Sequence, residues 1–473
     1  MPDYNLIIDG KKVATDETFP VINPATEEVV AQCPKATVEH VNQAVAAARR
    51  AFPAWSATPD AERSRMVHAI ADALEAHSEE LTKLLTLEQG KPGVGFAGMG
   101  GGFEIGGTLA WAHATADLEL PVEVIQDNDE ARIEVHRKPL GVIGSITPWN
   151  FPLMIAIWHT MPALRSGNTV VIKPSEFTPL TTLRAAEIIN EIVPPGVFNI
   201  VTGDGSLGAA ISNHPDINKI VFTGSTPTGK KIMESAAGSL KRITLELGGN
   251  DAAIVLADTD VAATAPKIFA TALFNNGQTC AALKRLYVHE DIYEEMCEAL
   301  AAIAAGVTTG DGSGDVDFGP IQNKTQYEKV CTIAREAKDS GARFLTGGEP
   351  TGGAGYFFPV TIVADIADDT RLVAEEPFGP ILPILKFSDV EDALRRANDS
   401  NNGLGGSVWS SDVAAATALA SRLECGTAWV NSHAAIQPNM PFGGVKESGM
   451  GVEFGRYGLE EYTNIQSLYI AKN

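Results

Sequence analysis

The sequence has few cysteines, and no two of them have the spacing of a paired motif. Its five cysteines lie at positions 33, 280, 297, 331 and 425, without a C-x-x-C pair. A disulfide framework and a structural zinc site are therefore not expected, and we predict no metal site. The first ten residues lack a basic start and a long apolar run, so nothing there resembles a secretion signal and we expect the protein in the cytoplasm.

Positive charge is also scarce. Lys and Arg number 36 against 59 Asp and Glu, which gives a formal net charge of -23. Such a chain would repel a phosphate backbone, so we predict no nucleic-acid partner. Residues 139–164 contain no charged Asp, Glu, Lys or Arg, yet four prolines and Asn150 interrupt them. Lipid would leave their polar groups unsatisfied, so we predict no membrane span either.

The chain is long enough for two or three packed domains, with 473 residues of which 44% are hydrophobic. Helical spacing over residues 38–52 predicts a packing helix. A longer helix is predicted to begin at Thr58-Pro59 and to carry Met66, Ile70 and Leu74, then residues 81–85. Both read as packing helices rather than as carriers of chemistry.

From position 141 short β-branched runs alternate with helical stretches. Strands are predicted over residues 142–147, 169–173, 197–201, 220–223, 252–256 and 285–288, and helices over 180–192, 205–213, 293–305 and 327–340. This alternation is typical of parallel α/β sheets covered on both faces. The tail, residues 464–471, reads as a strand that pairs with a hairpin of residues 119–124 and 131–137 or with another subunit.

Glycine patterns alone are weak guides. Gly93, Gly95 and Gly98 follow a helix and predict a loop, whereas Gly203, Gly205 and Gly208 follow a strand and open a helix. A third segment, residues 222–226, ends a strand in glycine and hydroxyl residues before another helix. Its free N–H groups suit a pyrophosphate, although an ordinary helix cap explains the same residues equally well.

Three further segments carry candidate chemistry. Cys280 follows the turn-like run N-N-G-Q-T, although a lone cysteine is more often a small buried hydrophobe. Glu246 lies in an apolar strand before two glycines, where its pKa would rise towards that of a general base, unless the side chain points to solvent. Asn150 is held between two prolines, where its amide can bind an oxyanion or merely cap a turn.

The combination of these segments resembles the aldehyde dehydrogenase superfamily. The likeness includes K-P-S-E at 173–176, E-E-P-F-G-P at 375–380, V-I-N-P at 21–24 and P-F-G-G at 441–444, and it runs nearly end to end. Many relatives carry Lys where this chain has Asn250, and residues 98–102 are unusually rich in glycine for a normally helical segment. Successive glycines lower helix stability by roughly 1 kcal/mol each relative to Ala.

The resemblance implies a mechanism. Cys280 is expected to add to an aldehyde carbonyl, and Asn150 with the Cys280 N–H to hold the resulting oxyanion. Hydride transfer to the nicotinamide would leave a thioester, and Glu246 would activate the water that hydrolyses it. The expected product is a carboxylic acid.

The resemblance also implies cofactor contacts. Lys173 and Glu176 would reach the adenosine ribose, Ser225 with Gly224 the pyrophosphate, and Glu376 the nicotinamide ribose beside Phe378. Further cofactor contacts are expected from Trp149, Thr147 and Gly205. A carboxylate at 176 suits ribose hydroxyls and would repel a 2′-phosphate, so we expect NAD, with NADP as the alternative that Lys173 supports.

By position in the family pattern, the aldehyde tunnel is expected to be rich in aromatic residues. Its expected lining is Phe151, Met154, Trp158, Phe274, Thr279, Ala281 and Phe442. Such a lining favours apolar or aromatic aldehydes. Residues 432–440, which close the tunnel in relatives, contain no Arg or Lys, which disfavours aldehydes that carry a carboxylate.

The expected fold is α/β, with a Rossmann-like cofactor domain, an α/β catalytic domain and a small β oligomerisation extension. The expected boundaries are 1–116 with 140–248, then 249–448, and finally 117–139 with 449–473. The partners we expect are a small-molecule aldehyde and further copies of the chain in a homo-dimer or homo-tetramer. Alternatives are a CoA-acylating relative, a cysteine hydrolase without nicotinamide, and a structural protein that has lost catalysis.

Overall fold

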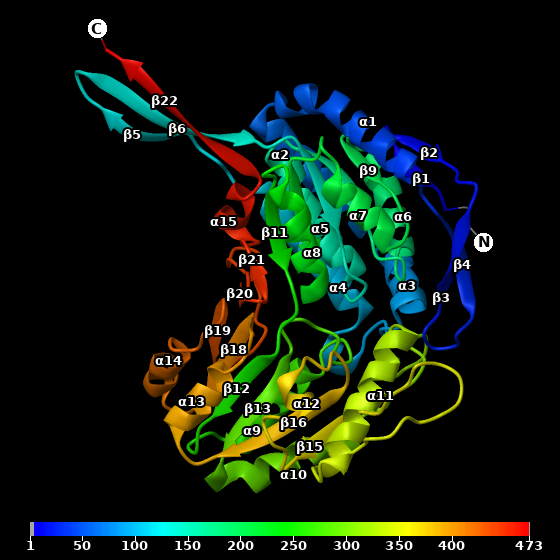
Figure 1. Ribbon diagram of the computed structural model, residues 1–473, viewed down its shortest axis with the longest axis vertical. Helices are drawn as coiled ribbons and strands as arrows, with labels where there is room; N and C mark the ends of the chain where they lie inside the picture. Colours follow the sequence, from blue (N-terminus) through cyan, green and yellow to red (C-terminus); the bar gives the residue numbers. More distant parts are fainter. Residues whose placement is uncertain (1–3, 473) are drawn as a thin grey trace.

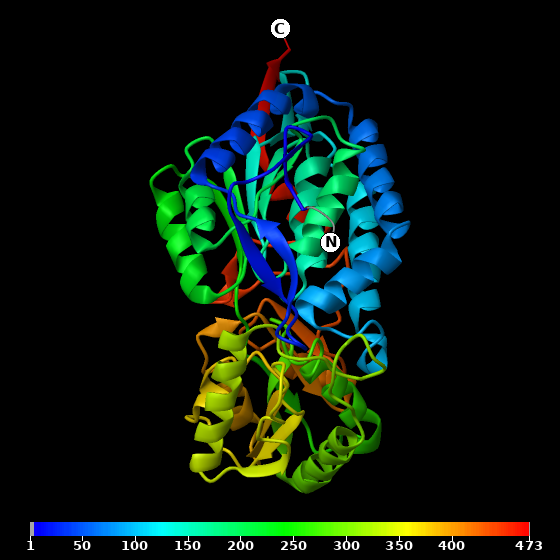
Figure 2. The same cartoon turned by 90° about the vertical axis from the view of Figure 1, so that its right-hand side faces the viewer.

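The protein folds into two α/β lobes and a projecting three-stranded sheet. The structure is a computed structural model that describes residues 4–472. The two lobes lie end to end, and the projecting sheet leaves the first lobe on the side away from the second (Figure 1). Figure 2, turned by 90°, shows the same two lobes and the C-terminal strand at the tip of the projection.

The first lobe is built on an eight-stranded sheet in the order β2-β1-β9-β8-β7-β10-β11-β21. Its strands are β1 (Leu6–Ile8), β2 (Lys11–Val13), β7 (Val142–Ile146), β8 (Thr169–Lys173), β9 (Phe198–Ile200), β10 (Lys219–Thr223), β11 (Arg242–Glu246) and β21 (Gly449–Met450). The five central strands β9, β8, β7, β10 and β11 are parallel. Alternating strands and helices therefore gave the correct sheet type, and the expected α/β fold class is confirmed.

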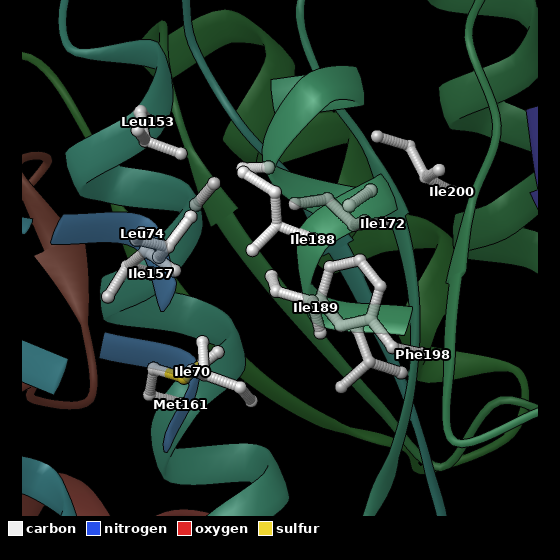
Figure 3. Close-up of a cluster of buried hydrophobic side chains, with 14 of the residues drawn as sticks. Ile70, Leu74, Leu153, Ile157, Met161, Ile172, Ile188, Ile189, Phe198 and Ile200 are labelled. Carbon is white, nitrogen blue, oxygen red and sulfur yellow. The ribbon is translucent and has the colours of Figure 1, made fainter. Parts of the chain in front are cut away.

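Helices cover both faces of this sheet, as its nearly continuous apolar strands require. One face packs against α1 (Val38–Ser56), α7 (Gly205–Asn213) and α8 (Thr226–Ala237). The other packs against α2 (Asp60–Glu75), α3 (Ser78–Gln89), α4 (Gly101–Ala116), α5 (Pro152–Arg165) and α6 (Leu180–Asn190). Figure 3 shows this second layer, in which Ile157 and Ile188 lie among side chains such as Phe198.

The predicted long helix after Thr58 is two helices. It begins at Asp60, one residue after Pro59, and breaks at His77 between α2 and α3. The His77 ring is hydrogen-bonded to the Ala73 carbonyl at 2.8 Å, and the Ser78 hydroxyl donates to the Glu75 carbonyl at 2.7 Å. These side-chain bonds compete with the helical ladder, so the break follows from local chemistry that the hydrophobic spacing does not show.

The glycine-rich segment forms a loop and then a helix. The loop includes the short 3₁₀ turn η1 (Phe96–Gly98), and α4 begins immediately after Gly100. The Gly100 N–H donates to the Val94 carbonyl at 2.7 Å. A Cβ on Gly100 would lie 2.2 Å from the Pro92 carbonyl oxygen, so the close approach of the two backbone segments requires glycine there.

The second lobe is a seven-stranded sheet in the order β14-β15-β16-β13-β12-β18-β19. Its strands are β12 (Asp251–Val255), β13 (Leu283–His289), β14 (Arg343–Thr346), β15 (Thr361–Ala364), β16 (Ile381–Phe387), β18 (Gly405–Trp409) and β19 (Thr427–Val430). One face is covered by α9 (Val261–Ala272) and α10 (Tyr293–Ala305), which follows the 3₁₀ turn η2 (Glu290–Ile292). The other face is covered by α11 (Lys324–Asp339), α12 (Arg371–Ala374), α13 (Val390–Asn398) and α14 (Val413–Ala420).

The projecting sheet joins the C-terminus to a distant hairpin, which is one of the two pairings expected from the sequence. It has the order β22-β6-β5, with β5 (Glu123–Asp127), β6 (Ala131–Pro139) and β22 (Thr463–Ala471). β22 pairs with β6 along all 9 of its residues. The hairpin's first strand begins at Glu123 rather than at position 119.

Shorter elements complete the fold. They are the pair β3 (Thr18–Ile22) and β4 (Val29–Pro34), the pair β17 (Asn402–Gly403) and β20 (Val445–Lys446), and α15 (Gly455–Glu460). The β3–β4 hairpin runs along the first lobe towards the second (Figure 2). Its tip bonds to the second lobe, because the Tyr356 N–H donates to the Pro24 carbonyl at 2.9 Å.

Candidate active site

A cleft of about 1280 Å³ opens between the lobes at the carboxyl ends of β7 and β10. These strands are neighbours, and the chain order runs in opposite directions on either side of them. Parallel α/β sheets bind ligands at such a switch point. The residues that follow β7 (148–150) and those at the end of β10 and the start of α8 (223–227) line one wall of the cleft.

The opposite wall brings several predicted site residues to the same space. Cys280, Glu376 and Phe378 come from the second lobe, and Leu247 and Gly248 come from the segment after β11. Of the residues predicted from the sequence, the cleft lining contains Asn150, Cys280, Trp149, Gly224, Ser225, Glu376 and Phe378. The nucleophile candidate and the amide candidate therefore share one cleft although they come from different lobes.

Cys280 lies on a tightly wound loop between α9 and β13. Three consecutive residues before it, Asn275, Asn276 and Gly277, have positive φ values of 52°, 59° and 71°. A Cβ on Gly277 would lie 2.1 Å from the Gly379 carbonyl oxygen. The Asn276 amide donates to the Gly319 carbonyl at 3.0 Å, so the loop is anchored as well as strained.

Asn150 is tied to this loop by hydrogen bonds. Its Nδ2 donates to the Gln278 carbonyl at 3.0 Å, and its own carbonyl accepts from Asn275 Nδ2 at 2.9 Å. An amide nitrogen carries two N–H donors, so the second N–H of Asn150 can serve a ligand oxygen near Cys280. The geometry therefore suits the predicted oxyanion role.

A buried ion pair supports Asn150, and the sequence patterns gave no sign of it. Lys91 Nζ donates to the Asn150 carbonyl at 2.9 Å and pairs with the Glu104 carboxylate. The other oxygen of Glu104 accepts from the N–H groups of Leu153 and Met154 at the start of α5, at 3.0 and 3.2 Å. One carboxylate thus caps a helix and holds the lysine that fixes the amide.

Glu246 ends β11 with a buried carboxyl group. Neither carboxyl oxygen has a hydrogen-bond partner within residues 4–472. Burial, and then the nearby negative charge of Glu453, raise the pKa of Glu246 well above its ordinary value. The side chain therefore does not point to solvent, and its environment is that of a general base.

The Cys280 thiol lies among opposing electrostatic influences. Burial raises its pKa to about 12; Lys284 lowers it, while Glu376, Glu246 and Asp251 raise it further. Glu246 thus acts on the thiol through its charge, although it is not among the residues that line the cleft. Burial favours the protonated thiol, so its proton must be removed before the sulfur can act as a nucleophile.

Aromatic side chains pack against Cys280 and continue into a second cluster. Cys280 packs against a cluster that contains Ala281, Phe442 and Trp158, and a neighbouring cluster contains Phe151, Met154, Trp158 and Phe274. Thr279 adjoins them through a 3.0 Å hydrogen bond to the Phe274 carbonyl. All seven residues predicted for the aldehyde tunnel therefore lie together.

Two aromatic residues that the sequence did not point out belong to the same group. Trp111 and Phe454 have ring centroids 5.4 Å apart, and Trp158 lies 4.7 Å from Phe454. Each comes from an element remote in sequence, α4 or the loop before α15. No local motif marks them, because their place beside Cys280 depends on how the lobes and the C-terminal segment pack.

Four predicted cofactor residues lie outside the cleft lining. Lys173 is buried, donates to the Pro174 carbonyl at 2.8 Å and lies 3.6 Å from Glu176, and Thr147 Oγ1 has no partner within residues 4–472. Gly205 begins α7, where Asp204 already accepts a hydrogen bond from the Ser206 N–H. An anion at that helix end would compete with a carboxylate.

The residues around α8 fit a dinucleotide better. Ser225 is the N-cap of this 12-residue helix and makes no side-chain cap bond. Pro227 carries no N–H and the Thr228 N–H donates to the Ser225 carbonyl at 3.1 Å, so the donor that this helix start offers to a phosphate is the Thr226 N–H. A Cβ on Gly224 would lie 2.5 Å from the Phe222 ring. Across the cleft the Glu376 carboxylate offers acceptors for hydroxyl groups, so a phosphate donor and a ribose acceptor face the same space.

Other kinds of site find less support in the described part of the chain. Among residues 4–472 no group of three or more His, Cys, Asp or Glu is arranged to hold a metal ion. Over the same residues no helix combines the length and the apolar character that a membrane span needs.

Comparison with known proteins gives a consistent result. The profile of the aldehyde dehydrogenase family matches residues 12–468. Phenylacetaldehyde dehydrogenase from Pseudomonas fluorescens is 41% identical over 99% of this chain and 96% of its own length, and aldehyde dehydrogenase 1A1 from Oryctolagus cuniculus is 39% identical over 98% and 93%. The solved NAD+ complex of aldehyde dehydrogenase from Bacillus cereus is 38% identical, with a TM-score of 0.96 over 100% of this chain and 97% of that one.

Proposed function

Because the chain belongs to the aldehyde dehydrogenase family, we propose that it oxidises an aldehyde to the carboxylic acid through a covalent bond to Cys280. The single observation that carries this proposal is the meeting of Cys280 and Asn150, from different lobes, at one cleft. NAD+ is the cofactor, and when bound it supplies the acceptor for the hydride that leaves the aldehyde carbon.

The first chemical step needs the Cys280 thiolate. The thiol proton leaves to solvent through the cleft that Cys280 lines, and Glu246 is kept for the later water step. The sulfur then bonds to the carbonyl carbon, and the carbonyl π electrons move to oxygen. The Asn150 amide and the Cys280 N–H receive that negative charge.

The second step releases the acid. Loss of hydride from the carbon restores the carbonyl as a thioester on Cys280. A water molecule adds to the thioester, Glu246 takes its proton, and the C–S bond breaks to return the thiolate. The buried, unpartnered carboxyl of Glu246 supports this role, because it makes no hydrogen bond within residues 4–472 that would have to be broken first.

The substrate class we propose is an apolar or aromatic aldehyde. The support is two adjoining apolar clusters that share Trp158: Cys280 packs against the one that contains Phe442, and the other contains Phe151 and Phe274. Residues 432–440 add Ile436 to this wall and contain no Arg or Lys. A relative 41% identical to this chain bears the name phenylacetaldehyde dehydrogenase, which agrees with an aromatic side chain on the substrate.

A preference for NAD over NADP is proposed from the pair of Lys173 and Glu176. The 3.6 Å ion pair directs the lysine charge to Glu176, so a 2′-phosphate would meet a carboxylate as well as an ammonium. The NAD+ complex of the Bacillus cereus relative agrees with that choice. The rate with NAD+ should therefore exceed the rate with NADP+ at equal concentration.

Two alternatives differ in the fate of the acyl group. A CoA-acylating enzyme would transfer the acyl group to a thiol, and acid formation without CoA excludes it. A cysteine hydrolase would cleave an activated ester without nicotinamide. The presence of Glu246 beside the nucleophile favours hydrolysis by water over transfer to CoA.

The decisive test replaces Cys280 by Ala. NADH production from an aromatic aldehyde should fall by at least about a thousandfold, because a covalent mechanism loses its nucleophile. Absorbance at the reduced-nicotinamide band measures this. The matched control is Cys331→Ala, which changes a thiol on α11 outside the site and should leave the rate unaltered. Appreciable turnover in the Cys280 variant would refute the mechanism.

A further inference from the structure

Lys284 lies at a bulge in the sheet of the second lobe, four positions after Cys280. In the β12–β13 ladder Asp251 pairs with Leu283 and Ala252 pairs with Arg285, so Lys284 has no opposite residue. A bulge changes the direction of the side chain that it carries, and bulges are common beside active sites. Here the side chain turns back towards the Cys280 loop.

The Lys284 ammonium is buried, and its side chain is only 3% exposed. Its Nζ donates to the Thr279 carbonyl at 2.7 Å and to the Cys280 carbonyl at 2.6 Å. It also pairs with Glu376 Oε1 at 3.1 Å. A longer hydrogen bond of 3.4 Å joins the ammonium to the Ala282 carbonyl. The shorter contacts of the ammonium are therefore to two carbonyls of the nucleophile loop and to one carboxylate across the site.

We propose that Lys284 is a positioning residue of the reaction, whose buried charge fixes the Cys280 peptide to Glu376 and favours negative charge on the sulfur and on the oxyanion. The inference rests on the proposed function. It adds a residue for which the family resemblance implied no role.

One geometric reason concerns the oxyanion donor. The Thr279 carbonyl and the Cys280 N–H belong to the same peptide group. When that carbonyl accepts a hydrogen bond from an ammonium, the peptide is polarised and its N–H becomes a stronger donor. Lys284 therefore strengthens the very N–H that receives the aldehyde oxygen, although it touches neither the substrate nor the sulfur.

A second reason concerns the charges around the thiol. Glu246 at the end of β11, Asp251 on β12 and Glu376 after α12 each raise the pKa of Cys280, and Lys284 opposes them. Asn250, where relatives carry Lys, is neutral and donates to the Val373 carbonyl at 2.9 Å. Lys284, on the bulge, is therefore the cation that acts on the sulfur from this part of the sheet.

The experiment follows alkylation of Cys280 by iodoacetamide from pH 7 to pH 10 in the full chain without cofactor, with the modified peptide measured by mass spectrometry. In Lys284→Met the rate at pH 8 should fall about tenfold or more, and the profile should move to higher pH. Lys284→Arg, which keeps the charge, should restore most of the rate. An unaltered profile in Lys284→Met would overturn the proposal.

The matched control is Lys241→Met. Lys241 is a second buried lysine that donates to two main-chain carbonyls, those of Ser212 and His214 at 2.9 and 2.8 Å, on the far side of the first sheet. A purely structural loss should appear in both variants as a lower melting midpoint. The shift in the alkylation profile should appear only in Lys284→Met, and an equal shift in both would overturn the proposal.

If Lys284→Met does not fold, Glu376→Gln decides the question. It removes the negative charge that Lys284 neutralises, so alkylation of Cys280 should become faster and its profile should move to lower pH. A slower or unchanged reaction would overturn the proposal. Alkylation needs no aldehyde and no hydride transfer, so a failure of the dehydrogenase assignment shows up separately, as turnover in Cys280→Ala.

Discussion

Glu246 and Glu376 are two carboxyl groups near one sulfur, and the fold treats them differently. Glu376 has an ammonium partner, Lys284 at 3.1 Å, and accepts from the Gly249 N–H at 3.3 Å. Glu246 has no hydrogen-bond partner within residues 4–472. A carboxylate that is already bonded suits binding, whereas one that is desolvated and free suits proton transfer. The two environments therefore agree with the roles that the resemblance implied, which are cofactor binding for Glu376 and proton transfer for Glu246.

Glu246→Gln should separate the two halves of the reaction. The amide cannot take the water proton, so one equivalent of NADH should form in a burst and steady turnover should fall by about a hundredfold or more. Rapid-mixing absorbance measures both phases. A steady rate equal to that of the unaltered enzyme would assign hydrolysis to another base, and the loss of both phases would make Glu246 essential for the thiol step as well.

The same variant gives a linked effect on stability. Burial raises the pKa of Glu246 in the folded protein above its pKa in the unfolded chain. The contribution of the protonated carboxyl group to folding stability is therefore fully present below the unfolded-state pKa, and it is lost as pH rises through the folded-state pKa. Above that range the unaltered protein must bury a charge, and Glu246→Gln does not. The variant's melting midpoint relative to the unaltered protein should therefore be higher at pH 9 than at pH 5.

At the scale of elements, α4 shows how glycine serves differently at the N-cap and within a helix. Gly100 lies where two backbone segments touch, while Gly106 lies on the exposed face of the same helix with nothing within 4 Å of an added Cβ. Gly106→Ala should stabilise the protein by about 0.5–1 kcal/mol through helix propensity. Gly100→Ala should destabilise it by about 1–3 kcal/mol through overpacking.

Thermal melting of the two variants checks this prediction. Opposite shifts are expected from the same chemical change, which separates the effect of backbone contact from that of propensity. A Gly106→Ala variant that melts below the unaltered protein would show that the glycine-rich stretch has a role that its contacts do not reveal.

The limits of sequence-based prediction also appear at this scale. Parallel strands such as β7 and β10 were predicted because apolar runs and glycine-rich ends are local signals. The break at His77 and the bulge at Lys284 were not, because each depends on hydrogen bonds or ladder register that hydrophobic spacing does not encode. The Lys91–Glu104 pair was missed for a similar reason, since only the packing of α4 against α5 brings it to Asn150.

At the scale of the whole molecule, the likeness to a family implied roles for residues whose local sequence allowed more than one interpretation. From the residues alone, Glu246 could point to solvent and Asn150 could cap a turn; the closed arrangement of both lobes buries the first and ties the second to the Cys280 loop. The domain boundaries, with 1–116 and 140–248 in one domain, 249–448 in another and 117–139 with 449–473 in the extension, stay a prediction. β21 extends the first sheet, so the C-terminal segment returns to the first lobe before β22 begins.

The projecting sheet is the part of the molecule that most needs a partner. Its two outer strands β5 and β22 each have one edge unpaired within residues 4–472, and Ile465 and Tyr469 are 60% and 64% exposed. Residues two or four apart on a strand share a face, so these side chains form part of one apolar surface. Such a surface on a sheet edge is typical of subunit contacts, which supports the proposed homo-oligomer.

Replacing Ile465 and Tyr469 together by Lys should convert a dimer or tetramer into monomers, because two charges would have to be buried in the contact. Sedimentation velocity measures the change in mass. Val413→Lys is the matched control, since Val413 is 58% exposed on α14 of the second lobe and its substitution should leave the assembly intact. If the double variant stays assembled while retaining its fold, the subunit contact lies elsewhere, and the projecting sheet is stabilised by its own pairings of β6 with β22 and β5.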